Sequence, residues 1–181
     1  MKQTIMLGVA ALLSLGTTMA VQYTDSNPAD VRLDANVNVF GGISNPLYNK
    51  SYTGNWDLLN EGYNPANETI TSATATFKLN DANGGSESYT ITIDGDTFKT
   101  GGSFSAPLLS TINVGGLIGA DALVTLDETG KLSYTITANS GVFWLKNATL
   151  VADSQSVPDG GMTLAMLGMA FGGLGLMRRR L

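Results

Sequence analysis

Histidine and cysteine are both absent from this chain of 181 residues. A Ser-His-Asp triad, a cysteine nucleophile and the usual zinc sites each require one of them and are therefore excluded. Paired carboxylates, as in glycosidases, remain available, because the chain has fifteen Asp and Glu residues. Most of these acids stand beside Gly, Asn or Thr, which favours solvated turn residues over a catalytic pair.

Side chains with hard oxygen ligands gather in two places, and calcium is the metal that they suit. The first cluster is Asn80, Asp81 and Asn83, and the second is Asp94 and Asp96. A strand expected at 86–93 would separate them, so they would not share one ion. A structural calcium at Asp81 or at Asp94 and Asp96 is one reading, and ordinary Asx and Gly turns are the other. No cofactor is otherwise expected.

Sugar binding is the ligand hypothesis that the aromatic residues offer, with Trp56 and Trp144 as its main candidates. In "VFWLK", strand alternation places Phe143 and Leu145 on one face and Trp144 on the other. Either that second face is exposed, or both faces pack against apolar layers. The aromatic residues considered are Tyr48, Tyr52, Trp56, Tyr63 and Trp144.

The elements that must position these side chains are strands. Period-two alternation of apolar residues with Thr and Ser marks the segments 74–79, 88–93 and 131–138. The pattern places six side chains in the core: Phe77, Leu79, Tyr89, Ile91, Tyr134 and Ile136. Further strands are expected at 31–40, 51–56, 122–126, 142–145 and 148–151.

Turn signals separate these strands. They are 80–85 ("NDANGG"), 94–96 ("DGD"), 100–102 ("TGG"), 127–130 ("DETG") and 138–141 ("ANSG"). The "DETG" turn predicts a hairpin that folds 122–126 back onto 131–138, and no internal segment predicts a helix. The fold class is therefore all-β: a single two-sheet β-sandwich, jelly-roll or immunoglobulin-like, with a closed barrel as the alternative.

The first twenty residues have the features of a secretory signal peptide. Lys2 is followed by an apolar run and then by small residues, so cleavage is expected between Ala20 and Val21. The all-β domain is expected to cover 21–156, and its six basic and fourteen acidic residues give a net charge of −8. Such a surface argues against nucleic acid as a partner.

The last 25 residues, 157–181, hold a second apolar segment. Residues 162–177 carry no charge. A helix of that length covers about 24 Å, which flanking glycines and snorkelling arginines extend toward a ~30 Å bilayer core. The sequence thus predicts a C-terminal transmembrane helix whose basic stop, Arg178, Arg179 and Arg180, stays in the cytoplasm. The fold would then be flanked by two apolar helices, the N-terminal signal helix and this one.

A short motif, an apolar helix and a terminal arginine cluster resemble the PEP-CTERM class of bacterial sorting tails. The motif Val157, Pro158, Asp159, Gly160 and Gly161 looks most like the VPDSG-CTERM variant, with Gly160 in place of serine. The segment 52–81, above all "GYNPANETITSATATF", is also similar to domains that carry such tails. The resemblance implies export, transient anchoring in the inner membrane and processing by an exosortase in a Gram-negative bacterium that makes exopolysaccharide.

Three functions follow from these observations. The first is a non-catalytic surface or extracellular-matrix protein associated with exopolysaccharide and biofilm. The second is a carbohydrate-binding module, which needs an exposed aromatic platform. The third is a secreted glycoside hydrolase, which needs a cleft with converging carboxylates.

Overall fold

The structure, a computed structural model, describes residues 19–36, 49–82, 84–104 and 110–157. The predicted signal peptide up to residue 18, the sorting motif from Pro158 onward and the predicted helix 162–177 lie outside these residues. Within the described residues, no helix has the length and apolarity needed to cross a bilayer.

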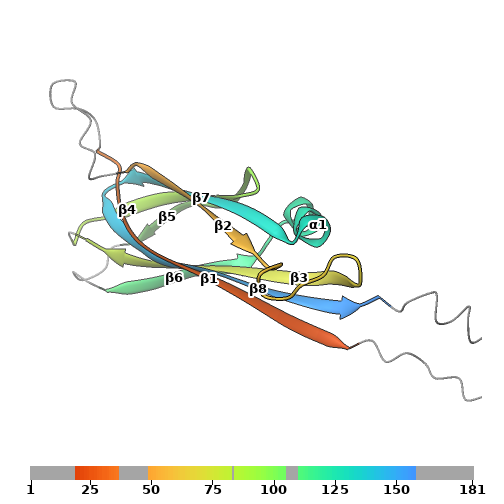
Figure 1. Ribbon diagram of the computed structural model, residues 1–181. Helices are drawn as coiled ribbons and strands as arrows, with labels where there is room; N and C mark the ends of the chain where they lie inside the picture. Colours follow the sequence, from red (N-terminus) through yellow and green to blue (C-terminus); the bar gives the residue numbers. More distant parts are fainter. Residues whose placement is uncertain (1–18, 37–48, 83, 105–109, 158–181) are drawn as a thin grey trace, which may run out of the picture.

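Eight strands form two antiparallel four-stranded sheets that face each other as a sandwich (Figure 1), so the predicted all-β class is confirmed. The first sheet has the order β1-β8-β3-β6, and the second has the order β2-β7-β4-β5. The strands are β1 (Ala20–Asp34), β2 (Ser51–Asp57), β3 (Glu68–Asp81), β4 (Glu87–Ile93), β5 (Asp96–Phe104), β6 (Thr111–Leu117), β7 (Lys131–Ser140) and β8 (Val142–Ser156).

The strand pairing identifies the type of sandwich. The first strand pairs with the eighth, the second with the seventh, the third with the sixth and the fourth with the fifth. The chain thus forms four successive antiparallel strand pairs. The further pairs β3–β8 and β4–β7 join these four pairs into two sheets. Such a strand order is that of a jelly roll, one of the two sandwich types that the sequence left open.

The space between the sheets is filled by the side chains that alternation predicted. Phe77, Leu79, Ile91 and Ile136 are fully buried, and Tyr89 and Tyr134 are nearly so. Three aromatic rings pack together at the centre in tilted and edge-on contacts, where the Trp56 and Tyr134 ring centroids are 4.4 Å apart and Phe77 packs against both. The prediction of these six core residues is confirmed.

The predicted strand 122–126 is wrong, because this segment lies in a helix, α1 (Ala120–Thr129). Its buried residues Ala122 and Leu126 are one helical turn apart, and the run "ALVTL" fits either pattern over so few residues. The "DETG" segment ends this helix: Gly130 adopts a φ of 68° and donates its N–H to the Leu126 carbonyl oxygen. The predicted hairpin between 122–126 and 131–138 is therefore also wrong.

Two strands predicted as separate, 142–145 and 148–151, are one strand, β8. The pairing register shifts at Lys146, which has no direct partner on β3 or β1. A bulge of this kind interrupts the alternation in the sequence without ending the strand. The expected turn at 100–102 is likewise wrong, because it lies inside β5.

The first strand begins eleven residues earlier than its predicted start at 31. It lies at the edge of its sheet and buries only Tyr23 and Leu33 fully, so most of it carries no apolar alternation. Pro28 and a left-handed residue, Asp30, interrupt the pairing further. Edge strands of this composition are hard to recognise from hydrophobic period alone.

Candidate functional site

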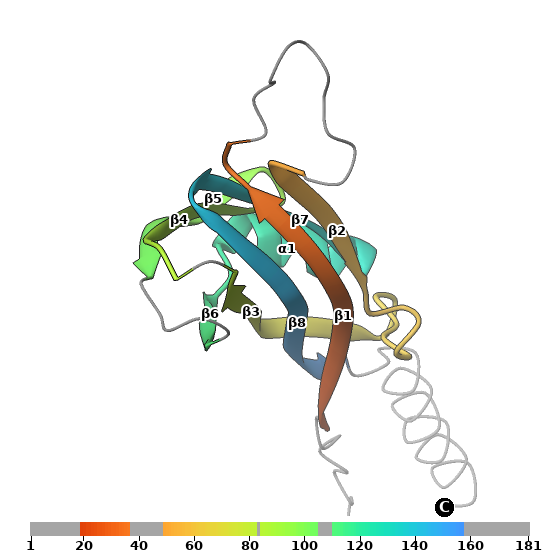
Figure 2. The same ribbon diagram turned by 90° about the vertical axis from the view of Figure 1, so that its left-hand side faces the viewer.

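The beginning of β1 and the end of β8 lie together at one pole of the sandwich, here called the chain-end pole. Ala20 pairs with Gln155, and the Ser156 N–H donates to the Met19 carbonyl oxygen at 3.3 Å. Both views show the two strands side by side along their length (Figures 1 and 2). Met19 and Val157, the two ends of the described domain, therefore lie at the same pole.

The predicted signal-cleavage bond joins Ala20 and Val21, which form the first two pairs of β1 with β8, and both residues are exposed. Val157, the first residue of the predicted sorting motif, is exposed and donates its N–H to the Asn67 carbonyl oxygen at 2.8 Å. Pro158, Asp159, Gly160, Gly161 and the arginines Arg178, Arg179 and Arg180 lie outside the described residues. Their roles stay predictions.

The opposite end of the sandwich, where β8 begins at Val142 and β3 ends at Asp81, is here called the far pole. Near this pole, Trp144 lies on the outer face of the first sheet. Its side chain is partly exposed, whereas Phe143 and Leu145 are fully buried, as the alternation in "VFWLK" predicted. Trp144 pairs with Arg32 on β1 and with Asn80 on β3. It is therefore a partly exposed indole on the outer face of the sheet, with one polar residue beside it on each neighbouring strand.

The surroundings of Trp144 are basic, although the domain as a whole is acidic. The Lys146 Nζ lies 4.6 Å from the Trp144 ring centroid, within the range of a cation–π contact. The bulge at Lys146 also brings its amine to Asp30, with which it forms an ion pair. Lys78 lies on the neighbouring strand, opposite Asn147. Three of the six basic residues between 21 and 156 are thus near one indole.

Trp56, the other candidate for sugar binding, belongs to the core. Its side chain is fully buried, and its Nε1 donates to the Ala148 carbonyl oxygen at 3.1 Å. A sugar ring cannot stack on it in the folded protein, so the prediction of Trp56 as a ligand residue is wrong. Tyr63 is also buried, Tyr52 is partly exposed, and Tyr48 lies outside the described residues.

The two clusters considered for calcium lie at opposite ends of β4, as predicted. Asp94 and Gly95 form the exposed two-residue turn between β4 and β5, with φ values of 53° and 85°, and Asp96 is the exposed first residue of β5. This geometry accounts for the aspartates as turn residues. Asp81 ends β3 at the far pole and is fully buried. In the described part of the chain, no group of three or more acidic side chains converges on one point.

Asp81 has an acidic neighbour that sequence reasoning missed, Glu87, the first residue of β4. Glu87 is also fully buried, and its pKa is raised, first by burial and then by the negative charge of Asp81. Alternation predicts both positions, because Asp81 continues the inward series of Phe77 and Leu79. Glu87 likewise precedes Tyr89 and Ile91 on the inward face of β4.

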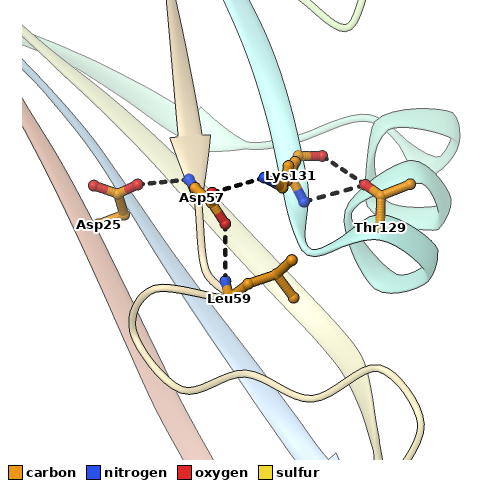
Figure 3. A network of polar contacts seen from close by, with 5 residues as sticks. All are labelled: Asp25, Asp57, Leu59, Thr129 and Lys131. Atoms are coloured by element: carbon orange, nitrogen blue, oxygen red, sulfur yellow. Dashed lines mark hydrogen bonds and ion pairs between the residues drawn. The ribbon is translucent and has the colours of Figure 1, made fainter.

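A polar network joins β2, β7 and α1 (Figure 3). The Lys131 Nζ lies 2.9 Å from Asp57 Oδ2, and its positive charge lowers the pKa of Asp57. The N–H groups of Asp57 and Leu59 donate to Asp25 Oδ2 and Asp57 Oδ1, and Thr129 Oγ1 bonds to the Lys131 backbone. These bonds fix the end of β2 and the start of β7, which is a structural role.

A second network lies near the chain-end pole. Glu68 Oε2 accepts hydrogen bonds from the Tyr23 hydroxyl at 2.7 Å and from Ser154 Oγ at 2.8 Å. Burial and the Glu68 contact raise the pKa of Tyr23 to about 12. The Tyr63 hydroxyl donates to Asp127 Oδ1 at 2.9 Å. Because these groups satisfy one another, the network ties β1, β3, β8 and α1 together.

Comparison with known proteins gives one match in sequence. Residues 156–181 match the model of the VPDSG-CTERM motif, a C-terminal tail that exosortases sort. The resemblance found in the sequence is thus confirmed, including the assignment to this variant despite Gly160. No curated protein matches the chain in sequence.

Three solved structures are similar to the chain at low sequence identity. Dimeric latent PorU from Porphyromonas gingivalis has a TM-score of 0.43 at 8% identity; the match covers 74% of this chain and 13% of that one. A family 35 carbohydrate-binding module from Clostridium thermocellum has a TM-score of 0.38 at 13% identity, covering 73% and 97%. The CBM35 from Cellvibrio japonicus Abf62 has a TM-score of 0.35 at 12% identity, covering 73% and 92%.

Proposed function

Because residues 156–181 carry a VPDSG-CTERM tail, we propose that this is an exported cell-surface or extracellular-matrix protein that an exosortase releases from the inner membrane. The supporting observation in the structure is the pairing of Val21, the first residue of the mature domain, with Ser154, which brings both ends of the domain to one pole. Both processing sites then face the membrane, and the far pole with Trp144 points away from it.

The polar character of the chain-end pole supports this orientation. Gln22, Asp153 and Ser72 form an exposed hydrogen-bonded row across β1, β8 and β3 close to the exit points. A folded sandwich with such a surface can stay in water beside the bilayer while its tail is held in it. The sequence from 157 onward is then the part presented to a membrane protease, and Pro158 with Gly160 and Gly161 favours an extended, accessible backbone there.

Substitutions in the motif test this proposal in the native host. Pro158→Ala and Asp159→Asn should leave precursor in the inner-membrane fraction, because the processing enzyme no longer recognises the motif. Asp153→Asn, four residues before the motif and exposed on β8, is the matched control and should be processed normally. Removal of 162–181 should give soluble periplasmic protein. Normal release of both motif variants would contradict the proposal.

The basic surface around Trp144 favours a second candidate function, binding of an anionic polysaccharide of the matrix. The partly exposed indole offers an apolar face for a sugar ring, and Lys146, Arg32 and Lys78 offer positive charge for its carboxylates. The Lys146 side chain lies over the ring and would exchange its ion pair with Asp30 for the sugar carboxylate when the sugar stacks. Most other surface charge is negative, so this face is where an anionic chain meets least repulsion.

Binding assays with polygalacturonate and with uncharged dextran test this candidate. Polygalacturonate should bind, and its affinity should fall as salt is added, because part of the attraction is electrostatic. Trp144→Ala should weaken binding about tenfold or more. Thr149→Ala, on the outer face of the same strand, should have little effect. Equal binding of dextran, or an unchanged affinity of Trp144→Ala, would refute a site at this surface.

A further inference from the structure

The described strands of the sandwich leave four sheet edges, β1 and β6 in the first sheet and β2 and β5 in the second. The edge of a sheet presents unpaired N–H and C=O groups to any other strand. Proteins usually block such an edge with proline, charge, a bulge or a covering segment. The protection of each edge therefore decides where a further strand can be added.

Three of these four edges are protected. β1 contains Pro28 and a shift in register beside it. β2 is covered by β1, because the Asn27 side chain donates a hydrogen bond to the Asn55 carbonyl oxygen. β5 carries Lys99 and two register shifts against β4. In contrast, β6 ("TINVGGL") has no charge, no proline and no register shift against β3.

Hydrogen bonds at the two ends of β6 show which of its backbone groups are free. The Asp81 N–H donates to the Ser110 carbonyl oxygen at 3.2 Å, and the Ile118 N–H donates to the Ala73 carbonyl oxygen at 3.1 Å. Bonded and non-bonded pairs alternate along an antiparallel ladder, so residues 112, 114 and 116 bond to β3. The alternate residues direct their N–H and C=O groups away from β3: Thr111, Asn113, Gly115 and Leu117. No described strand pairs with these groups.

We propose that β6 pairs with β6 of a second copy of this chain, about a two-fold axis that passes through Val114. In this register Asn113 lies opposite Gly115 of the second copy, and Thr111 lies opposite Leu117. Each of these is a bonded pair and occurs twice, so all the free groups are used in about eight hydrogen bonds. The two first sheets then join into one continuous sheet.

The side chains of β6 suit this register, because opposite residues of an antiparallel pair lie on the same face. On the inner face, Val114 meets Val114 of the second copy, and Ile112 meets Gly116. Ile112 and Val114 pack against the core but are only partly buried in the single domain. On the outer face, Gly115 leaves room for Asn113. The second copy therefore covers apolar surface that one domain leaves exposed.

The distribution of charge also favours a second copy at this edge. The net charge of −8 between 21 and 156 makes most surfaces of the domain repel another copy, whereas β6 is uncharged. Lys78 lies opposite Asn113 on β3, so the two Lys78 residues would be three strand spacings apart, about 14 Å. This separation exceeds the Debye length of about 8 Å at physiological salt, and their repulsion is therefore largely screened.

The two-fold axis reverses the strand direction, so the chain-end poles of the two copies would point in opposite directions. Two precursors that are held in one membrane by their tails could not pair in this way. Pairing would then follow release from the membrane. This order of events rests on the proposed function, whereas the pairing itself does not.

Single-cysteine crosslinking tests the register, because the chain has no cysteine of its own. Val114→Cys would lie on the axis in a non-bonded pair with a Cα–Cα distance of about 4.5 Å, which a disulfide can bridge. Oxidation of this full-length variant in detergent should give covalent dimers. Thr111→Cys is the matched control and should stay monomeric on a denaturing gel, because its copy would be about 20 Å away along the strand.

Light scattering of the full-length protein in detergent tests the pairing without a crosslink. The wild-type protein mass should be twice that of the monomer. Asn113→Lys places two like charges beside the axis and should raise the dissociation constant about tenfold or more. Thr53→Lys, at an exposed position of the edge strand β2, is the matched control and should stay dimeric. Asn113→Lys should still be processed in the native host, so a failure of pairing and a failure of processing are measured separately.

Wild-type protein that is monomeric at every concentration would overturn the proposal. A dimer that Asn113→Lys leaves intact and that Val114→Cys does not crosslink would overturn it as well, because the contact would then lie elsewhere in the chain. If Val114→Cys fails to fold, the comparison of Asn113→Lys with Thr53→Lys decides.

Discussion

Gly54 and Tyr134 lie directly opposite each other across the β2–β7 pair, and the Tyr134 ring occupies the space that a β-carbon at residue 54 would need. The phenol oxygen and ring carbons are the atoms that such a carbon would meet. Only glycine therefore lets this tyrosine lie flat over β2 and reach the rings of Trp56 and Phe77.

Gly54→Ala should lower the free energy of unfolding by about 1–3 kcal/mol, because the new methyl group forces the tyrosine out of its position. Tyr134→Phe in the same chain should recover part of this loss by removing the hydroxyl group. Gly119→Ala is the control, since nothing lies near its β-carbon position. Chemical denaturation of the three variants measures the differences, and equal stability of Gly54→Ala and wild type would contradict the packing.

Ile91 and Ile136 are cross-strand partners on the inward face of β4 and β7, and both are fully buried. Each single substitution by alanine should cost about 2–5 kcal/mol. The double variant should cost less than their sum, because the two side chains share one cavity. Thr92→Ala and Thr135→Ala, on the outward face of the same two strands, should stay within about 0.5 kcal/mol of wild type. Similar losses for inward and outward variants would mean that the register is wrong.

The strands that could be predicted from the sequence are those with one solvent-exposed face and one buried face. The segments around Phe77, Ile91 and Ile136 alternate cleanly, and their inward residues are the observed core. The turn "DGD" was also recognised, because a two-residue hairpin needs residues that tolerate positive φ.

The errors arise where the local pattern is ambiguous. The five-residue run at 122–126 fits a strand or a helix, and only packing against β3 and β7 selects the helix. The bulge at Lys146 breaks the alternation of β8 without ending the strand. In the glycine-rich strand β6 only Ile112 and Val114 alternate before Gly115 and Gly116, so its apolar pattern is too short to identify a strand.

For the candidate sites, the alternation of inward and outward residues predicts the positions of acidic residues as well as those of the aromatic residues. Extending the inward series by one step on β3 and β4 places Asp81 and Glu87 in the interior, and a charged residue at such a position marks a functional or structural site. The same rule separates Trp144 from Phe143 and Leu145. It could not assign Trp56, because the short strand "SYTGNWD" has a glycine as the inward neighbour of its tryptophan.

The two tryptophans should respond differently to truncation. Trp56→Ala should cost about 3–5 kcal/mol, because it empties the centre of the core and leaves the Ala148 carbonyl oxygen without its donor. Trp144→Ala should cost about 1 kcal/mol or less, since its ring is partly exposed and its contact with Lys146 lies at the surface. Urea denaturation of both variants measures this difference. A loss for Trp144→Ala as large as that for Trp56→Ala would place its ring in the core instead.

Stability should depend on pH through Glu87. Its pKa is raised in the folded state, so its contribution is favourable at low pH and is lost as the pH rises through that raised value. The pKa values of Asp57 and Asp153 are lowered, so their contributions are lost only at acidic pH. Stability should therefore rise as the pH is lowered through the raised pKa of Glu87, and fall again at more acidic pH, where Asp57 and Asp153 become protonated. Glu87→Gln should remove the rise, and an unchanged rise in this variant would assign it to another group.

The most direct test of the central claim, export followed by removal of the sorting tail, is intact-mass spectrometry of the mature protein recovered from the surface or matrix of the native host. The measured mass should correspond to a chain that begins at Val21 and ends near the motif at Val157–Gly161, without the segment that contains Arg178–Arg180. A mature surface protein whose mass still includes these three arginines would contradict the claim, because the tail would then be a permanent membrane anchor.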